Sequence, residues 1–324
     1  MTPHKHTIHC RHHHFGWDNT NTPVCTAASG DTITFETVDS SGGQLNGSST
    51  LPDLVKLDFG KVNPVTGPVV VDGAKPGDAV KLTLLDFAPT PGPKGGGWGW
   101  TGLIPGFGLL ADQFKEPDLY IWKYDAAGSG PLLFGPSLTG KCARIPLRPF
   151  AGTIGLALAE NGPHSVVPPR RVGGNMDFRD LTKGAEILLP VEVAGALLSL
   201  GDTHAAQGDG EVCGTAIESP MTVTAKIELV KGAGLKFPRA FIPGGSSRPV
   251  DAAGYDVTTG IGPDLMTGAK DAVAGMIDLL CARHKITVNE AYMLCSVAGD
   301  LAIAEIVDMP NWIVTFRMPR SIFD

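Results

Sequence analysis

Alternating hydrophobic and polar positions recur in short stretches along the chain, and they predict strands with one buried face. In the run from Thr32 to Glu36, Ile33 and Phe35 share one side. Three such runs each follow a small turn that contains glycine: Thr32–Val38, Ala79–Phe87 and Glu186–Val193. Further strands are predicted at Leu119–Tyr124, Ile154–Ala159, Ala196–Leu200, Met221–Leu229, Tyr255–Thr259 and Trp312–Phe316.

The C-terminal quarter has a different period and predicts two helices. Apolar residues from Leu265 to Leu280 fall at helical spacing after Pro263 and Asp264. Thr287, with Glu290 three positions later, predicts a capping box at the start of a second helix. We therefore expect an α/β fold: a β-rich body of sandwich-like sheets, with a C-terminal helical pair packed on it. Since no low-complexity linker divides the chain, residues 1–324 are predicted to form a single domain.

Composition narrows the class of protein. The chain is 43% hydrophobic and 18% charged, which is typical of a folded globule. Its 42 glycines and 26 prolines are spread along the sequence and predict many tight turns. The formal net charge of −7 argues against nucleic acid or an anionic membrane as a partner.

The N-terminus has no apolar run of the signal-peptide type, and no run of apolar residues is long enough to span a bilayer. The 6 cysteines are far apart, and no two of them form a CxxC pair. We therefore expect a cytoplasmic protein whose thiols are reduced.

Histidines provide the first chemical signal, because most of the 9 fall between His4 and His14. An expression tag or a disordered histidine-rich arm would explain such a cluster. Alternatively, neutral imidazoles from this region ligate a divalent metal. Asp18 follows in the same region and would add a carboxylate oxygen.

A second signal lies in the run from Leu200 to Glu211, which is rich in glycine and acidic residues. If it begins as a strand, Asp202 and His204 are two positions apart and point to the same face. Glu211 and Glu218 follow, and so many acidic groups are costly to bury without a counter-charge, which a metal ion would supply. A solvated polar loop with glycine turns would explain the same residues.

Several long motifs, taken in order, resemble the acetamidase/formamidase family along nearly the whole chain. They are His13-His14-Phe15-Gly16-Trp17-Asp18-Asn19, Asn63–Pro68, Gly99-Trp100-Thr101 with Ile104–Gly108, Pro168–Arg171 with Gly173-Gly174-Asn175-Met176-Asp177, Gly201–Glu218, Thr258–Met266, Ala291–Ser296 and Val307–Trp312. So many motifs in one order are far more specific than any one of them.

The resemblance implies hydrolysis of formamide, acetamide, a compact γ-lactam or a similar small amide. It also implies a β-rich α/β body, a divalent metal and a homo-oligomer; the metal is expected to be zinc, with calcium as an alternative. From their chemistry, we assign His14, Asp18, Asp202 and His204 as the metal ligands.

Amide hydrolysis needs a proton acceptor and a donor to the developing oxyanion. Glu160, which follows an apolar strand, is the first choice for the base, and Glu218 is the second. The backbone amides of Gly173 and Gly174, or Asn175, would bind the oxyanion. Each of these residues also has an ordinary structural explanation, such as an ion pair or a turn.

The size of the pocket is predicted from Gly95–Trp100 and Gly102–Gly108, where glycines let the backbone approach a ligand and Trp100 would wall the site. This predicts a small pocket that excludes long acyl chains. Two rival functions stay open: an amidase with Cys213 as nucleophile, and a binding protein for small amides that does not hydrolyse them.

Overall fold

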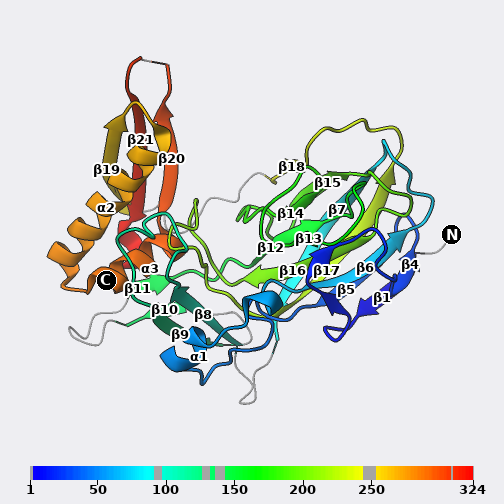
Figure 1. Cartoon of the computed structure of the whole chain (residues 1–324), viewed down its shortest axis with the longest axis horizontal. Helices are drawn as coiled ribbons and strands as arrows, with labels where there is room; N and C mark the ends of the chain where they lie inside the picture. The colour runs from blue at the N-terminus through cyan, green and yellow to red at the C-terminus, as the bar shows by residue number, and fades with distance from the viewer. Residues whose placement is uncertain are drawn as a thin grey trace.

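Two large β-sheets packed against each other form the body of the molecule, and a smaller arm of strands and helices stands beside them (Figure 1). This is a computed structural model, and it describes residues 3–90, 97–125, 132–135, 143–243, 253–307 and 309–323. The elements below are those of the described residues.

The first sheet pairs its strands in an order that mixes distant parts of the sequence. Its strands, in order across the sheet, are β1 (Lys5–Ile8), β5 (Thr32–Glu36), β17 (Met221–Val230), β7 (Ala79–Pro89), β15 (Glu186–Pro190) and β18 (Arg239–Phe241). Its pairs are antiparallel except β1 with β5. The alternation of buried and exposed residues along β17 is the pattern of a strand with one face in a core.

The second sheet carries the strand that leads to the candidate site. Its strands are β14 (Gly173–Asn175), β12 (Phe150–Gly155), β16 (Leu198–His204), β6 (Val65–Val71) and β2 (His13–His14), with β4 (Cys25–Ala27) also paired to β6. β16 and β12 are buried along their whole length, because both of their faces are covered.

One hydrophobic cluster joins the two sheets. It contains Ile33, Phe35 and Leu82 from the first sheet, and Val69 and Leu200 from the second. Because residues from both inner faces share one core, the two sheets form a β-sandwich.

The remaining strands and the helices form smaller units. These are the pairs β3 (Gly16–Trp17) with β13 (His164–Ser165), β8 (Gly97–Leu103) with β9 (Asp118–Tyr124), and β10 (Leu132–Phe134) with β11 (Ala143–Ile145), and the sheet β19 (Tyr255–Gly262), β21 (Trp312–Pro319) and β20 (Asp300–Glu305). The helices are α1 (Leu51–Val55), α2 (Leu265–His284) and α3 (Val288–Ala298), and short 3₁₀ turns lie at Phe59–Lys61 and Arg320–Ile322.

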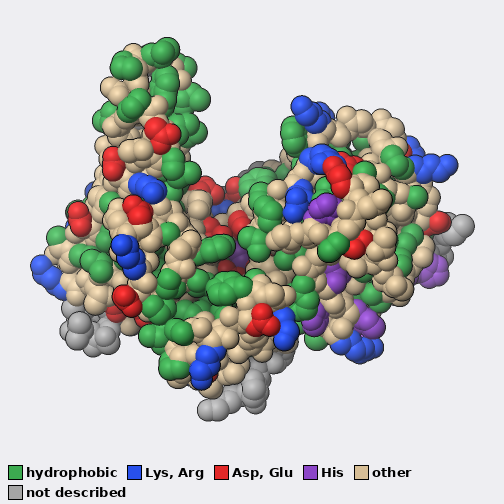
Figure 2. Space-filling model, viewed as in Figure 1, with side chains coloured by type: hydrophobic (Ala, Val, Ile, Leu, Met, Phe, Trp, Pro, Cys, Tyr) green, Lys and Arg blue, Asp and Glu red, His purple; other side chains and the backbone are tan. Residues whose placement is uncertain are grey.

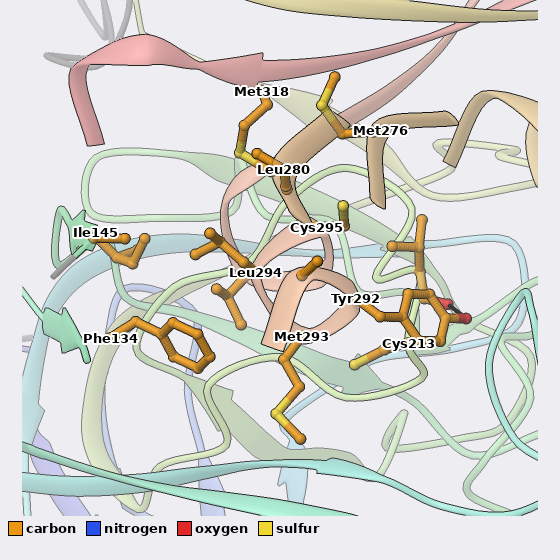
Figure 3. Packing of buried hydrophobic residues seen from close by; sticks show 14 of the residues in the cluster. Phe134, Ile145, Cys213, Met276, Leu280, Tyr292, Met293, Leu294, Cys295 and Met318 are labelled. Carbon is orange, nitrogen blue, oxygen red and sulfur yellow. Dashed lines mark hydrogen bonds between the residues drawn. The ribbon is translucent and has the colours of Figure 1, made fainter. Parts of the chain in front are cut away.

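A second hydrophobic cluster packs the helical pair against the small sheets. Tyr292, Leu294 and Cys295 of α3 point into it, together with Phe134 of β10 and Met276 of α2 (Figure 3). The capping box predicted at Thr287 is present, with the Thr287 hydroxyl bonded to the Glu290 amide and the Glu290 carboxylate to the Thr287 amide.

The predicted fold class is therefore confirmed: the chain is mostly β-strand, and α2 and α3 pack on sheets. Every predicted strand overlaps an observed strand, and four of the nine have both ends within two residues of the expected ends. β15, β19 and β21 differ by three residues at their C-terminal ends. β12 and β16 run through Phe150–Gly155 and Leu198–His204 instead of Ile154–Ala159 and Ala196–Leu200.

Within the described residues, no helix is both long and apolar enough to cross a membrane. The described cysteines are free thiols, as the sequence predicts.

Candidate active site

The C-terminal end of β16 places Asp202 and His204 side by side. Nε2 of His204 lies 3.2 Å from Oδ1 of Asp202, which confirms that the two side chains share a face. Asp202 has a left-handed backbone (φ 51), a conformation that Asp tolerates better than most residues. The Phe150 ring of the neighbouring strand meets the imidazole edge-on at 5.0 Å and fixes its plane.

Glu218 reaches the same imidazole from a separate segment. Its backbone pairs with Trp100 through two hydrogen bonds of 2.9 Å, so β8 holds it in place. Oε1 accepts a hydrogen bond from the Ala216 amide at 2.8 Å, while Oε2 lies 3.1 Å from Nε2 of His204. Asp202, His204 and Glu218 are all buried, at 3%, 1% and 3% exposure.

Gln207 sets the tautomer of His204. The Gln207 amide nitrogen donates to the backbone carbonyl of Asp177 at 2.9 Å, so its oxygen faces Nδ1 of His204, also at 2.9 Å. Nδ1 therefore carries a proton, and in the neutral ring Nε2 presents a lone pair to the two carboxylates. A lone pair facing carboxylate oxygens is repulsive unless a proton or a cation lies between them.

Two further acids complete the cluster. Asp177 and Glu211 converge with His204, and the ligand atoms of these three residues lie within 4.8 Å of one another. Oδ1 of Asp177 and Oε2 of Glu218 are buried without a hydrogen-bond partner. Four carboxyl groups thus surround one imidazole, which is costly to bury without a positive charge.

Arg179 ties together the two segments that carry Asp177 and Glu211. It is buried and forms ion pairs with Asp209, at 2.9 Å, and with Asp300 at the start of β20. Because Arg179 is two residues after Asp177 and Asp209 is two residues before Glu211, this ion-pair network holds both acids in position.

Gly152 of β12 forms the floor under the cluster. A Cβ atom there would lie 2.5 Å from Oδ1 of Asp177, 3.0 Å from Oδ2 of Asp202 and 3.0 Å from Cε1 of His204. The Gly152 carbonyl also accepts hydrogen bonds from the amides of Met176 and Asp177. Only glycine lets the polar cluster approach the sheet this closely.

The acids strongly perturb one another's ionisation. Burial and the neighbouring carboxylate of Asp202 raise the pKa of Asp177 to about 7. Burial and Asp177 likewise raise the pKa of Glu211 well above its usual value. Burial alone would lower the pKa of His204, but the charges of Glu218 and Asp202 raise it well above its usual value.

The cluster lies at one side of a cavity of about 230 Å³. The polar part of its lining consists of Ser40, Asn63, Asn175, Asp177, Asp202, Glu211, Thr215 and Glu218. The apolar side chains are those of Leu57, Phe59, Val62, Trp100, Ile104, Phe107 and Val167. In the space-filling view, acidic side chains gather in the hollow between the arm and the sandwich, with hydrophobic side chains around them (Figure 2).

The structure brings Trp100, Asn175, Asp202 and Glu218 to this cavity, with His204 in contact with two of them. Trp100 donates its indole N–H to the buried Asp39 carboxylate at 2.9 Å, which fixes the ring as a wall. Oδ1 of Asn175 accepts a hydrogen bond from Thr153 at 2.7 Å, and the Nδ2 of the same amide is a donor.

The other two predicted metal ligands are not at the cavity. Both ring nitrogens of His14 have protein partners, the Gly16 carbonyl at 2.8 Å and the Ser199 hydroxyl at 2.9 Å. Oδ1 of Asp18 accepts hydrogen bonds from the amide and hydroxyl of Thr20. Neither residue belongs to a group of converging metal-ligand atoms among the described residues.

Glu160 and the two glycines also lie outside the cavity lining. The Glu160 side chain is 53% exposed and forms an ion pair with Arg171. The Gly173 amide donates to the Arg170 carbonyl at 3.1 Å, and a Cβ atom at Gly173 would lie 2.4 Å from the Ile154 carbonyl oxygen. Gly173 and Gly174 therefore permit close strand packing in β14, with positive φ angles of 95° and 100°.

Cys213 does not fit the role of a nucleophile. It is 1% exposed, and burial raises the pKa of its thiol. Its Sγ contacts Thr215 and the Gly102 carbonyl oxygen, and it does not line the cavity.

Sequence reasoning did not assign Asp177, Gln207 or Ser40 to the site. Asp177 ends a family motif, and Gln207 follows His204 by three residues. The sequence therefore marks both positions, but it does not show that their side chains contact the site. Ser40 gave no signal, because it reaches the cavity only through the loop after β5.

Comparison with known proteins identifies the family. The acetamidase/formamidase family model matches residues 2–161 and 157–324. An acetamidase of Mycolicibacterium smegmatis is 32% identical over 270 residues, which cover 68% of this chain and 66% of that protein.

Solved structures agree with this assignment. A γ-lactamase from Delftia acidovorans is 25% identical with a TM-score of 0.86, over 97% of this chain and 90% of that one. An acetamidase from Bacillus halodurans is 31% identical with a TM-score of 0.65, over 96% of both chains. The chain therefore belongs to the acetamidase/formamidase family, whose named members are hydrolases of amide C–N bonds.

Proposed function

We propose that the chain hydrolyses small amides at the cavity beside His204, with a divalent cation held by Asp202, His204 and Glu218. The observation that carries the proposal is the convergence of buried carboxylates on the Nε2 lone pair of His204. The γ-lactamase and acetamidase names of its relatives support an amide or a compact lactam as the substrate.

The donor set fits a divalent cation. Neutral imidazole and carboxylate oxygens are ligands of Zn²⁺, and the excess of carboxylates also suits Ca²⁺. The unpartnered Oε2 of Glu218 and the Nε2 lone pair of His204 would both gain a partner. Such an ion supplies Lewis-acid polarisation of the amide carbonyl and eases deprotonation of water.

The remaining polar groups of the cavity supply the rest of the chemistry. Glu211 is paired with Asp177 and is not one of the three proposed metal ligands. It takes the proton of the attacking water and passes it to the leaving nitrogen. We assign this role to Glu211 instead of Glu160 or Glu218, because Glu160 is paired with Arg171 and Glu218 faces His204. Nδ2 of Asn175 donates to the carbonyl oxygen as negative charge develops there.

Three Glu→Gln variants test the roles with the same chemical change. Glu218→Gln should lose bound metal and ammonia release together. Glu211→Gln should keep metal but lower kcat by roughly 10²–10⁴-fold, the usual contribution of a general base. Glu160→Gln is the matched control and should change neither, with metal measured by elemental analysis and ammonia by a coupled assay.

Metal removal tests the proposal as a whole. Enzyme freed of metal by a chelator should be inactive, and Zn²⁺ or Ca²⁺ added back should restore activity. Full activity in protein shown to be metal-free would overturn the cation assignment. If thiol alkylation or Cys213→Ser abolished activity, the cysteine mechanism would replace it; if amides bound without release of ammonia, the chain would be a binding protein.

A further inference from the structure

The cavity lining is partly polar and partly apolar, and its apolar residues have no role in the chemistry proposed above. The acids and Asn175 are among the polar residues. Leu57, Trp100 and Ile104 also line the cavity and belong to a small hydrophobic cluster of the protein. A substrate with its amide at the acids would therefore place the rest of its atoms against hydrocarbon.

The mouth of the cavity carries exposed hydrophobic side chains that no core requires. Phe59, Phe107 and Val167, here called the collar, are 56%, 47% and 36% exposed. None of the three belongs to a hydrophobic cluster of the described residues. Exposed apolar groups that line a cavity are typical of ligand contact.

Phe107 is held at the mouth by the loop that carries Glu211. A Cβ atom at Gly214 would lie 3.0 Å from Cδ1 of Phe107, so the ring rests on the Gly214 backbone. The Phe107 amide also donates to the Ile104 carbonyl at 2.9 Å, which closes a tight turn. The ring is therefore a positioned part of the wall.

The volume of the cavity limits the size of the substrate. Its volume of about 230 Å³ equals that of about eight water molecules at roughly 30 Å³ each. Formamide would fill less than half of it. Two glycines of this region serve backbone packing: a Cβ atom at Gly99 would lie 2.7 Å from the Glu218 carbonyl oxygen, and one at Gly108 would lie 2.6 Å from the Cys213 carbonyl oxygen. Gly95 and Gly96 lie outside the described residues.

Charge selects further among amides of the right size. Four carboxyl groups line the cavity, and no lysine or arginine does so among the described residues. Besides the proposed metal ion, a substrate that carries its own carboxylate would meet acids and hydrocarbon, with no lysine or arginine of the described lining to pair with it.

We infer that the preferred substrates are uncharged amides with a compact hydrophobic body, branched or cyclic, of about seven or eight non-hydrogen atoms in all. This inference rests on the proposed function and specifies its substrate class. Each methylene that the apolar wall accommodates contributes roughly a fourfold gain in affinity. The gain from formamide to a substrate that fills the cavity is therefore roughly 10²–10³-fold in kcat/KM, provided that the added contacts form in the transition state.

A substrate series measures this directly on the full chain with its metal. kcat/KM is compared for formamide, acetamide, isobutyramide, cyclopentanecarboxamide and a bicyclic γ-lactam, and for butyramide against succinamate, which carries a carboxylate at the end of its chain. We expect kcat/KM to rise with the size of the neutral body, and succinamate to react at least 10-fold more slowly than butyramide.

Phe107→Ala tests the collar, and Phe237→Ala is the matched control, because Phe237 is 57% exposed and lies outside the cavity lining. Phe107→Ala should lower kcat/KM for cyclopentanecarboxamide about 10-fold and change that for formamide less than twofold, while Phe237→Ala changes neither.

The outcomes separate this inference from the proposed function. Formamide as the best substrate, equal rates for succinamate and butyramide, or an equal loss on both amides in Phe107→Ala would overturn the inference and leave amide hydrolysis standing. If none of the amides is hydrolysed by metal-loaded protein, the proposed function itself fails.

Discussion

Replacing Gly152 with alanine should damage the active site and leave the fold intact. Gly152 lies in β12 directly under three side chains of the acidic cluster. An added methyl group would stand 2.5 Å from Oδ1 of Asp177 and 3.0 Å from both Oδ2 of Asp202 and Cε1 of His204.

The size of the effect follows from these distances. Since ordinary contacts of a Cβ atom begin near 3.4 Å, Asp177 would have to retreat by about 0.9 Å, and Asp202 and His204 by about 0.4 Å. Asp177 and Asp202 border the cavity, so their side chains can move without opening the core. A displacement of about 1 Å in a catalytic group can cost roughly 10²-fold in rate. We expect Gly152→Ala to lower kcat by at least that factor and to weaken metal binding.

The assay combines ammonia release, metal content and thermal unfolding. Gly262→Ala is the matched control, because Gly262 also lies in a strand and a Cβ atom there would meet nothing within 4 Å. We expect the control to keep full activity, and both variants to unfold within a few degrees of the parent protein. Activity within threefold of the parent in Gly152→Ala would refute the close approach of the cluster to β12.

Three further predictions concern other parts of the molecule. Asn175→Ala should lower kcat by roughly 10²-fold with little change in KM, because it removes a donor to the oxyanion; an unchanged kcat would exclude this role. Arg179→Met leaves the buried Asp300 carboxylate without this guanidinium and should destabilise the fold by about 3 kcal/mol in urea unfolding, so a loss below about 1 kcal/mol would show that the ion-pair network is dispensable. Burial opposes ionisation of Asp31, but hydrogen bonds from the amides of His4 and Ala28 and from His6 lower its pKa to about 2. Because this folded-state pKa lies below the unfolded value of about 3.9, Asp31 stabilises the fold above pH 4, and that contribution disappears as the pH falls towards 2. Asp31→Asn should flatten the dependence of the melting temperature on pH between pH 4 and pH 2. An unchanged slope of melting temperature against pH would contradict the lowered pKa of Asp31.

The sequence by itself determined most of the local structure. Alternation from Thr32 to Glu36 and the capping box at Thr287 depend on neighbours within four residues, so the elements they predict are found at those places. The pairing of Asp202 with His204 was predictable for the same reason, since the two-residue period of a strand fixes which side chains share a face.

The tertiary structure decided which of the chemically capable residues meet. Asp177, Glu211 and Glu218 converge on His204 from three separate segments. No local sequence pattern predicts that these segments meet at one end of β16. His14, Asp18 and Glu160 have the same chemistry, yet their strands and loops direct them to Ser199, Thr20 and Arg171. The role of Gly99 and Gly108 was equally invisible in the sequence, because it depends on whether a glycine faces a ligand or a neighbouring backbone. Periodicity is a property of the chain within a few residues, whereas the packing of two sheets and an arm is set by contacts between residues far apart in the sequence.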